Sequence, residues 1–218
     1  MNYVNKRDIP CPHCNKNIDT HAIPIISSDT ATEQLAKKLQ EKLDGVYVTA
    51  LSKGYVLPVG ATMVGAAIAT IGSKVVKVAA LSGANANLIL SFIQGGLGND
   101  VKLVGDNVAP ANFKTLLLDS LSTPIAAITT GMAAIPDPKY PVGSCAGQKI
   151  IQYLVSQSNP TTARIKKINM AEIFWKSGGK SAWSTGQLVE SCNTCNRVLP
   201  MLLCNYNNDG EKVPYNLS

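Results

Sequence analysis

Three cysteines in the C-terminal third of this 218-residue chain have the residue types and the spacing of metal ligands. Cys145 opens a segment with helical periodicity, and the C-x-x-C pair of Cys192 and Cys195 opens a second one. Thiolates at the starts of two helices can hold zinc in three positions and leave the fourth to water, as in a catalytic rather than a structural site. The first turn of a helix also stabilises the anionic thiolate. We therefore predict a three-cysteine zinc site.

The segment from Gly143 to Cys204 carries these ligands and resembles the zinc-dependent cytidine and nucleic-acid deaminase superfamily, in particular its bacterial toxin branch. We extend the resemblance over residues 107–218. It implies an α/β fold: a deaminase-like three-layer α/β/α core with a short mixed sheet, preceded by a mainly α-helical N-terminal region. It also implies zinc as cofactor and the conversion of cytosine to uracil, or of adenine to hypoxanthine, in a nucleotide or single-stranded nucleic acid.

One position departs from that family. There the first ligand is followed two residues later by a glutamate, which carries protons between water, ring and leaving ammonia. This chain has Gly147 at that position. Three interpretations stay open: an inactivated variant that keeps fold and metal, a protein that binds without turnover, or a carboxylate elsewhere that has taken the role.

Glu172 is the best candidate for the relocated carboxylate. It lies in the apolar run Ile168–Trp175, which predicts a buried strand. Burial raises the pKa of a carboxylic acid toward the range in which a general acid–base works at neutral pH. In the deaminase fold this strand lies beside the metal-bearing helices. The alternative is that Glu172 pairs with a lysine at a strand edge.

A second C-x-x-C pair lies near the N-terminus, where Cys11 and Cys14 have the spacing of a zinc-ribbon knuckle. His21 is a candidate third ligand there, although a solvated histidine is the commoner case. Alternatively, the knuckle completes a four-thiolate structural site with the distant pair. Two other cysteines would then be buried thiols: Cys145 and Cys204.

Differences in composition along the sequence divide the chain into three regions. Residues 1–44 hold the knuckle and a helix, residues 45–106 form a Gly- and Ala-rich hydrophobic helical region, and residues 107–218 form the deaminase-like domain. Within 107–218, candidate strands cover 125–130 and 132–135 around a glycine.

The first helix is predicted to begin at the capping box Thr30-x-x-Glu33 and to end at Gly45. Its apolar face carries residues four apart: Leu35, Leu39 and Leu43.

Residues 54–73 and 78–99 contain no charged side chain, and each run is near the roughly 20 residues that span a bilayer. One interpretation is a membrane-inserting helical hairpin, with membrane contact through residues 54–99. The other, which we favour, is a helical hairpin buried against the rest of the protein, because Asn85, Asn87 and Gln94 dilute the hydrophobicity.

Around the predicted site, Ser144 is a suitable N-cap for a helix from Cys145 to Val155. The helix after the C-x-x-C pair should end near Pro200. The intervening loop contains Trp183, which either stacks on a base or packs structurally.

Composition bounds these interpretations. The chain has 45% hydrophobic residues, which excludes a disordered tail, and a net charge of +6, which suits a polyanionic substrate. The polar start Met1–Lys6 does not resemble a secretory signal, so paired cysteines favour metal over disulfides.

The toxin resemblance implies export by a non-classical route, action in the cytoplasm of a target cell, and a cognate immunity protein with an acidic contact surface.

Overall fold

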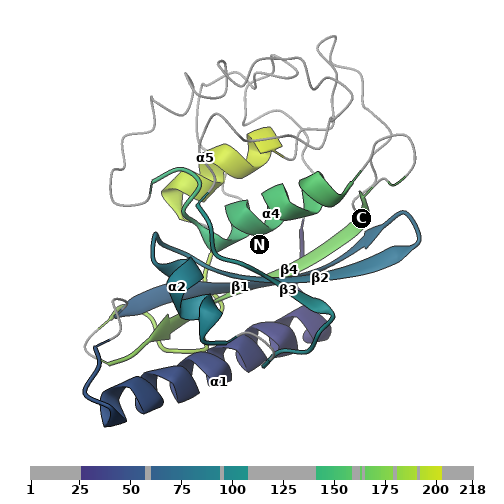
Figure 1. The fold of residues 1–218 in the computed structure, drawn as a ribbon. Helices are drawn as coiled ribbons and strands as arrows, with labels where there is room; N and C mark the ends of the chain where they lie inside the picture. The colour runs from purple at the N-terminus through teal and green to yellow at the C-terminus, as the bar shows by residue number, and fades with distance from the viewer. Residues whose placement is uncertain are drawn as a thin grey trace.

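The computed structural model describes residues 26–56, 60–93, 96–107, 141–158, 163, 165–178, 181–190 and 192–202. Within these ranges, four strands form one sheet and helices pack on both of its faces (Figure 1). In chain order the elements are α1 (Thr30–Ser52), β1 (Ala61–Ile71), β2 (Lys74–Leu81), α2 (Ala86–Ser91), β3 (Val101–Val104), α4 (Ala146–Gln157), β4 (Ile165–Lys176) and α5 (Asn193–Leu202).

The sheet is mixed, with strand order β3-β2-β1-β4. β1 pairs antiparallel with β2 on one side and with β4 on the other, whereas β3 runs parallel to β2. The α/β class with a short mixed sheet is therefore confirmed. β1 comes from the predicted region 45–106 and β4 from 107–218, so strands from both regions share one sheet.

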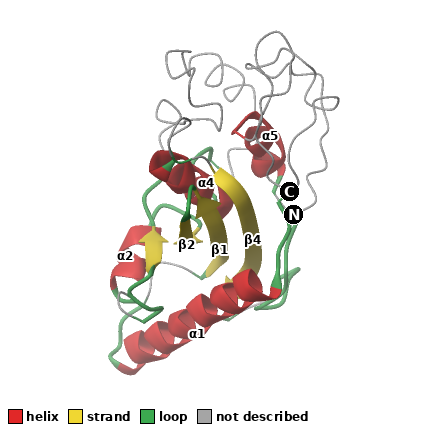
Figure 2. Ribbon diagram, turned by 90° about the vertical axis from the view of Figure 1, so that its right-hand side faces the viewer, coloured by secondary structure: helices red, strands yellow, loops and turns green. Residues whose placement is uncertain are grey.

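The alternation of side chains along the central strands separates two hydrophobic cores. Val64, Ala66 and Ile173 point to the face covered by α1 and α2. Ala67 and Met170 point to the opposite face, which α4 and α5 cover. Figure 2 shows α1 on one side of the strands and α4 on the other. Because successive strand residues face opposite sides, the even-numbered β4 residues from Ile168 to Phe174 lie on the α4 side.

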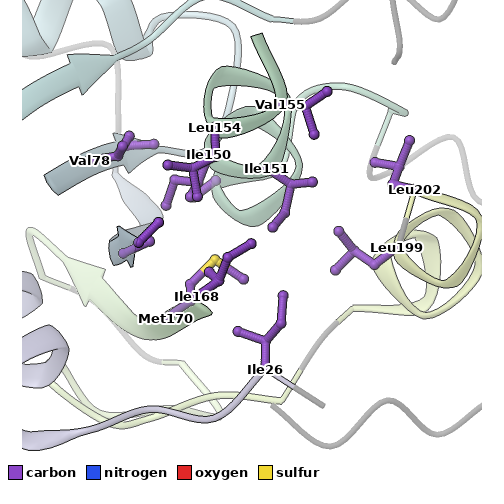
Figure 3. Packing of buried hydrophobic residues seen from close by; sticks show 14 of the residues in the cluster. Ile26, Val78, Ile150, Ile151, Leu154, Val155, Ile168, Met170, Leu199 and Leu202 are labelled. Carbon is purple, nitrogen blue, oxygen red and sulfur yellow. The ribbon is translucent and has the colours of Figure 1, made fainter. Parts of the chain in front are cut away.

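Helix α4 lies close to the sheet because its apolar side chains recur at helical spacing. Ile150, Ile151, Leu154 and Val155 are buried in the core that also holds Ile168 and Met170 of β4 (Figure 3). Such spacing places all four on one helix face.

The close approach of α4 depends on a glycine of β1. A Cβ atom at Gly65 would lie 2.9 Å from Ile150 Cδ1 and 3.0 Å from Ala146 Cβ. Gly65 is also the register partner of Glu172 in β4. The small residue thus lets the first turn of α4 lie over the strand pair that carries the carboxylate.

The prediction that residues 45–106 are mainly helical is wrong, although α1 ends in this region and α2 lies within it. Residues 61–71 and 74–81 are the strands of a hairpin whose turn contains Gly72 at φ 60°. β1 is a central strand buried on both faces, so it is uncharged and apolar without alternation, a pattern that a buried helix shares. The predicted helical hairpin over 54–99 is therefore absent, and no described helix combines the length and apolar character needed to cross a bilayer.

The first helix differs at both ends from its prediction. Asp29 is the N-cap, and Thr32 rather than Glu33 completes the capping box, because the Asp29 carboxylate accepts the Thr32 amide at 2.8 Å. The helix continues past Gly45 to Ser52. Leu39 and Leu43 are buried as predicted. The candidate strands 125–130 and 132–135 lie outside the described residues.

Candidate metal centre

The structure brings the three predicted cysteines together although 47 residues separate Cys145 from Cys192. The Sγ atoms of Cys145, Cys192 and Cys195 all lie within 4.8 Å of one another, and the first two are 3.5 Å apart. Tetrahedral zinc with bonds of about 2.3 Å to sulfur holds its sulfurs about 3.8 Å apart. The three thiols therefore fit a single ion of that kind, and Cys145 is not an isolated buried thiol.

Two helix starts deliver these sulfurs. Cys145 is itself the N-cap of α4, with extended backbone at φ −73° and ψ 144°, so the predicted cap at Ser144 is one residue too early. Cys192 precedes the first residue of α5, and its Sγ accepts the backbone N–H of Cys195 at 3.4 Å. Both helices thus begin beside the cluster, where their N-terminal ends stabilise negative charge. α5 extends to Leu202 and passes the predicted end near Pro200.

Gln148 forms a hydrogen bond with one of the three sulfur atoms, that of Cys195. Its side chain is fully buried; Nε2 donates to Cys195 Sγ at 3.2 Å, while Oε1 accepts the Gly143 amide at 2.7 Å. The amide of Gln148 cannot titrate, but it fixes the orientation of Cys195, as residues that are hydrogen-bonded to metal ligands commonly do.

Lys149 anchors the same end of α4 to the sheet. Its fully buried Nζ donates to the carbonyl oxygens of Leu81 and Gly83 at 3.0 Å each and to that of Gly105 at 2.8 Å. A buried ammonium is tolerated only when it is hydrogen-bonded in this way. The lysine thereby ties the end of β2 and the loop after β3 to the helix that carries Cys145.

The three thiols share charge unequally. Hydrogen bonding from Cys145, and then from Cys195, lowers the pKa of Cys192 to about 3. The same bond with Cys192 raises the pKa of Cys145, and bonds with the other two cysteines, together with burial, raise that of Cys195. The Cys192 thiolate therefore accepts hydrogen bonds from the other two thiols. A cation is needed to keep all three sulfurs deprotonated.

Glu172 lies beside this cluster. The buried strand predicted for Ile168–Trp175 is confirmed within β4, and the Glu172 side chain is buried. Its Oε1 accepts the backbone N–H of Gly147 at 2.9 Å. Burial raises the pKa of this carboxyl to about 7, and the Gly147 hydrogen bond opposes that rise. β4 is the outer strand of the sheet, but within the described residues no lysine forms a salt bridge with Glu172, against the alternative of a lysine partner.

Gly147 and Glu172 are fitted to each other. A Cβ atom at position 147 would lie 3.3 Å from both carboxylate oxygens, tighter than nine in ten Cβ contacts in proteins. The carboxylate thus occupies the space into which a side chain at position 147 would point. The sequence gives no signal of this relationship, because the two residues are 25 positions apart and on different elements.

The cluster and the carboxylate open into one pocket of about 1020 Å³. Its walls come from the start of β1, the turn after β2, the start of α4 and the segment after β4. The described lining residues are Gly60, Ala61, Met63, Ser82, Gly83, Ala84, Asn85, Asn107, Pro141, Ser144, Cys145, Glu172, Trp183, Gln187, Leu188, Val189, Glu190, Cys192 and Cys195. The volume is that of a site for a drug-sized ligand.

No protein-family model, curated protein or solved structure matches the chain. Several predicted residues also fall outside the described part of the structure: Cys11, Cys14, His21 and Cys204. Sequence reasoning missed the roles of Gln148 and Lys149, both buried polar residues of α4, because these roles depend on partners that only the fold brings near.

Proposed function

We propose that this protein is a zinc-dependent deaminase that hydrolyses the exocyclic amino group of cytosine, or of adenine, in a nucleotide or a single-stranded nucleic acid. One observation carries the proposal: a buried glutamate with a pKa near neutrality shares a pocket with three converging cysteines. Zinc deaminases pair three such ligands with a glutamate that is not a ligand. A three-layer core with helices on both faces of a short mixed sheet is compatible with this family.

In this proposal Cys145, Cys192 and Cys195 hold the metal. Zinc, when bound, supplies a Lewis acid that activates water for attack at neutral pH. Three thiolates give the site excess negative charge, which makes an efficient proton acceptor beside it more important. The hydrogen bond from Gln148 to Cys195 withdraws part of that charge.

Glu172 moves the protons. As a carboxylate it accepts a proton from the attacking water and passes it to the ring nitrogen. It then accepts the proton of the hydroxyl group added to the ring carbon and passes it to the departing amino group. Water and the amino-bearing base are thereby converted to the oxo base and ammonia. A pKa near 7 suits a group that must work in both directions, since driving force and correct protonation state are then balanced. The Gly147 amide holds the carboxylate oriented toward the start of α4.

The toxin role belongs to the same proposal and rests on the resemblance alone. The protein would leave its cell by a non-classical route, act in the cytoplasm of a target cell, and be neutralised at home by an immunity protein with an acidic surface. Expression in a bacterial cytoplasm should then arrest growth, whereas the Glu172→Gln protein should be tolerated at equal abundance.

The test is ammonia release by the purified protein. Zinc content is measured first, and cytidine, adenosine, their monophosphates and unpaired oligonucleotides are then assayed. Cys145→Ser should lose both metal and activity. Glu172→Gln should keep the metal and lose about 10²- to 10⁴-fold in rate, the usual contribution of acid–base catalysis.

Glu190 provides a matched control, because it lines the same pocket but is exposed. Glu190→Gln should retain activity. Zinc binding without ammonia release from any substrate would instead identify a non-catalytic, zinc-stapled binding module, and activity that survives in Glu172→Gln would remove that residue from the mechanism.

A further inference from the structure

The two tryptophans of the chain differ sharply in their surroundings. Trp175 is 1% exposed, and its indole N–H donates to Asp44 at 2.7 Å. Trp183 is 38% exposed and lines the pocket that holds the cysteine cluster. It contacts Phe174 edge to face, with ring centroids 5.5 Å apart and planes at 62°. An indole left partly open at a pocket wall has apolar area available to a ligand.

The segment that carries Trp183 is fixed to β4 by its backbone. The Gly186 amide donates to the Phe174 carbonyl at 2.8 Å, and the Phe174 amide donates to the Gln187 carbonyl at 2.9 Å. The turn is closed by Gln187, whose Oε1 accepts the Ser184 amide at 3.0 Å. Trp183 is therefore positioned before a ligand arrives, which reduces the entropy lost on binding.

Phe174 of β4 relates the position of Trp183 to that of Glu172. Phe174 and Glu172 are two residues apart on β4 and so lie on the same face, about 7 Å apart along the strand. Trp183 packs on Phe174 and lines the same pocket as Glu172. A planar ring stacked on the indole would thus occupy the pocket that Glu172 and the cysteines also line.

We infer that Trp183 is the base-stacking residue of this pocket and that the ligand is a nucleoside unit whose base is unpaired. The nature of the reacting group rests on the proposed function, whereas the stacking is inferred from the pocket itself. A base within a duplex has both faces covered and cannot stack here, whereas a free nucleotide or a base in a single strand can. Asn85 also lines the pocket, and its side chain makes no capping bond to α2.

Fluorescence of the Glu172→Gln protein tests the inference without turnover. Excited at the red edge of indole absorption, the protein should show saturable quenching by cytidine or adenosine and none by ribose 5-phosphate, which has no base. Quenching should vanish in Trp183→Phe, because the remaining Trp175 is buried. Affinity in that variant, measured by calorimetry, should stay within about threefold because phenylalanine also stacks.

Trp183→Ala should weaken nucleoside binding roughly 5- to 100-fold, as expected when one aromatic–base stack is lost. In the protein with Glu172 intact, the same change should raise KM and leave kcat within a few fold. Equal nucleoside affinity in Trp183→Ala and its parent would overturn the inference, as would equal quenching by ribose 5-phosphate or by a duplex. The alanine variant is compared only if its unfolding transition matches the parent; otherwise Trp183→Leu, which keeps apolar bulk without stacking, takes its place.

The two proposals fail separately. Ammonia release with an unchanged KM in Trp183→Ala would leave the deaminase proposal standing and remove the stacking role. Base-dependent quenching of Trp183 without ammonia release would do the reverse.

Discussion

The backbone amide of Gly147 donates to Glu172 Oε1 at 2.9 Å and joins the start of α4 to the middle of β4. A Cβ atom at position 147 would lie 3.3 Å from both oxygens of that carboxylate. Under the proposed deaminase function, the proton-carrying glutamate of that family would fall at the position of Gly147. Glycine at 147 and glutamate at 172 therefore make a matched pair, in which the carboxylate reaches the cluster from the sheet instead of from the helix.

Gly147→Ala should destabilise the protein by about 1–3 kcal/mol, because the added methyl group forces the carboxylate or the helix to shift in a packed site. Urea unfolding measures this difference. Gly45→Ala in α1 is the matched control, since nothing lies within 4 Å of its added Cβ and α1 is helical there. That change should stabilise by roughly 0.5–1 kcal/mol, as alanine does in a helix interior. A neutral Gly147→Ala would show that the contact is not restrictive.

Exchanging the two positions tests whether Glu172 is a relocated proton carrier. Gly147→Glu alone should reduce ammonia release, because two carboxylates would then compete for one space and repel each other. Gly147→Glu combined with Glu172→Ala should be more active than Glu172→Ala alone. If Gly147→Glu alone is instead more active than the parent, the parent is a disabled enzyme and Glu172 is not the shuttle.

The dependence of turnover on pH should reflect the ionisation of Glu172. As the proton acceptor it must be deprotonated in the free enzyme, and burial raises its pKa to about 7. kcat/KM should therefore fall about tenfold per pH unit below pH 7 and level off above it. The profile is recorded for a substrate that does not itself ionise in this range. A plateau extending down to pH 5 would exclude a buried carboxylate with this pKa as the base.

Stability should depend on pH through the same group. Its pKa is about 7 in the folded protein and 4.5 for an ordinary glutamate, as in the unfolded chain, so between these pH values the folded state binds more protons than the unfolded state. The contribution of Glu172 is then most favourable at low pH and declines as pH rises from 4.5 to 7, by about 3 kcal/mol.

Glu172→Gln isolates this contribution, because glutamine has no such titration. In metal-free protein, the unfolding free energy of Glu172→Gln relative to the parent should rise by about 3 kcal/mol between pH 4.5 and 7 and stay level above that. The comparison between variants is needed because Cys192, whose folded pKa is lowered to about 3, contributes a slope of the opposite sign. A difference that does not vary with pH would contradict the raised pKa.

Sequence could predict the elements whose own residues show a local pattern. The buried strand around Glu172 and the apolar face of α4 follow from short apolar runs and helical spacing, and C-x-x-C spacing pointed to metal. β1 could not be assigned in this way, since a Gly- and Ala-rich uncharged run suits a buried helix and a central strand equally well. Its pairing with β4, about 100 residues later, decides between them. The Gly147–Glu172 contact is non-local for the same reason.

Gln148 should influence metal affinity without being a ligand. Its Nε2 donates to Cys195 Sγ at 3.2 Å, and its Oε1 is held by the Gly143 amide, so the donor cannot rotate away. Gln148→Ala removes the bond that orients Cys195 and should weaken zinc binding about 10- to 100-fold, measured by competition with a chromophoric chelator. Gln157→Ala is the control, because that residue is exposed at the far end of the same helix. Equal zinc affinity in both variants would mean that the cysteines are positioned by their helices alone.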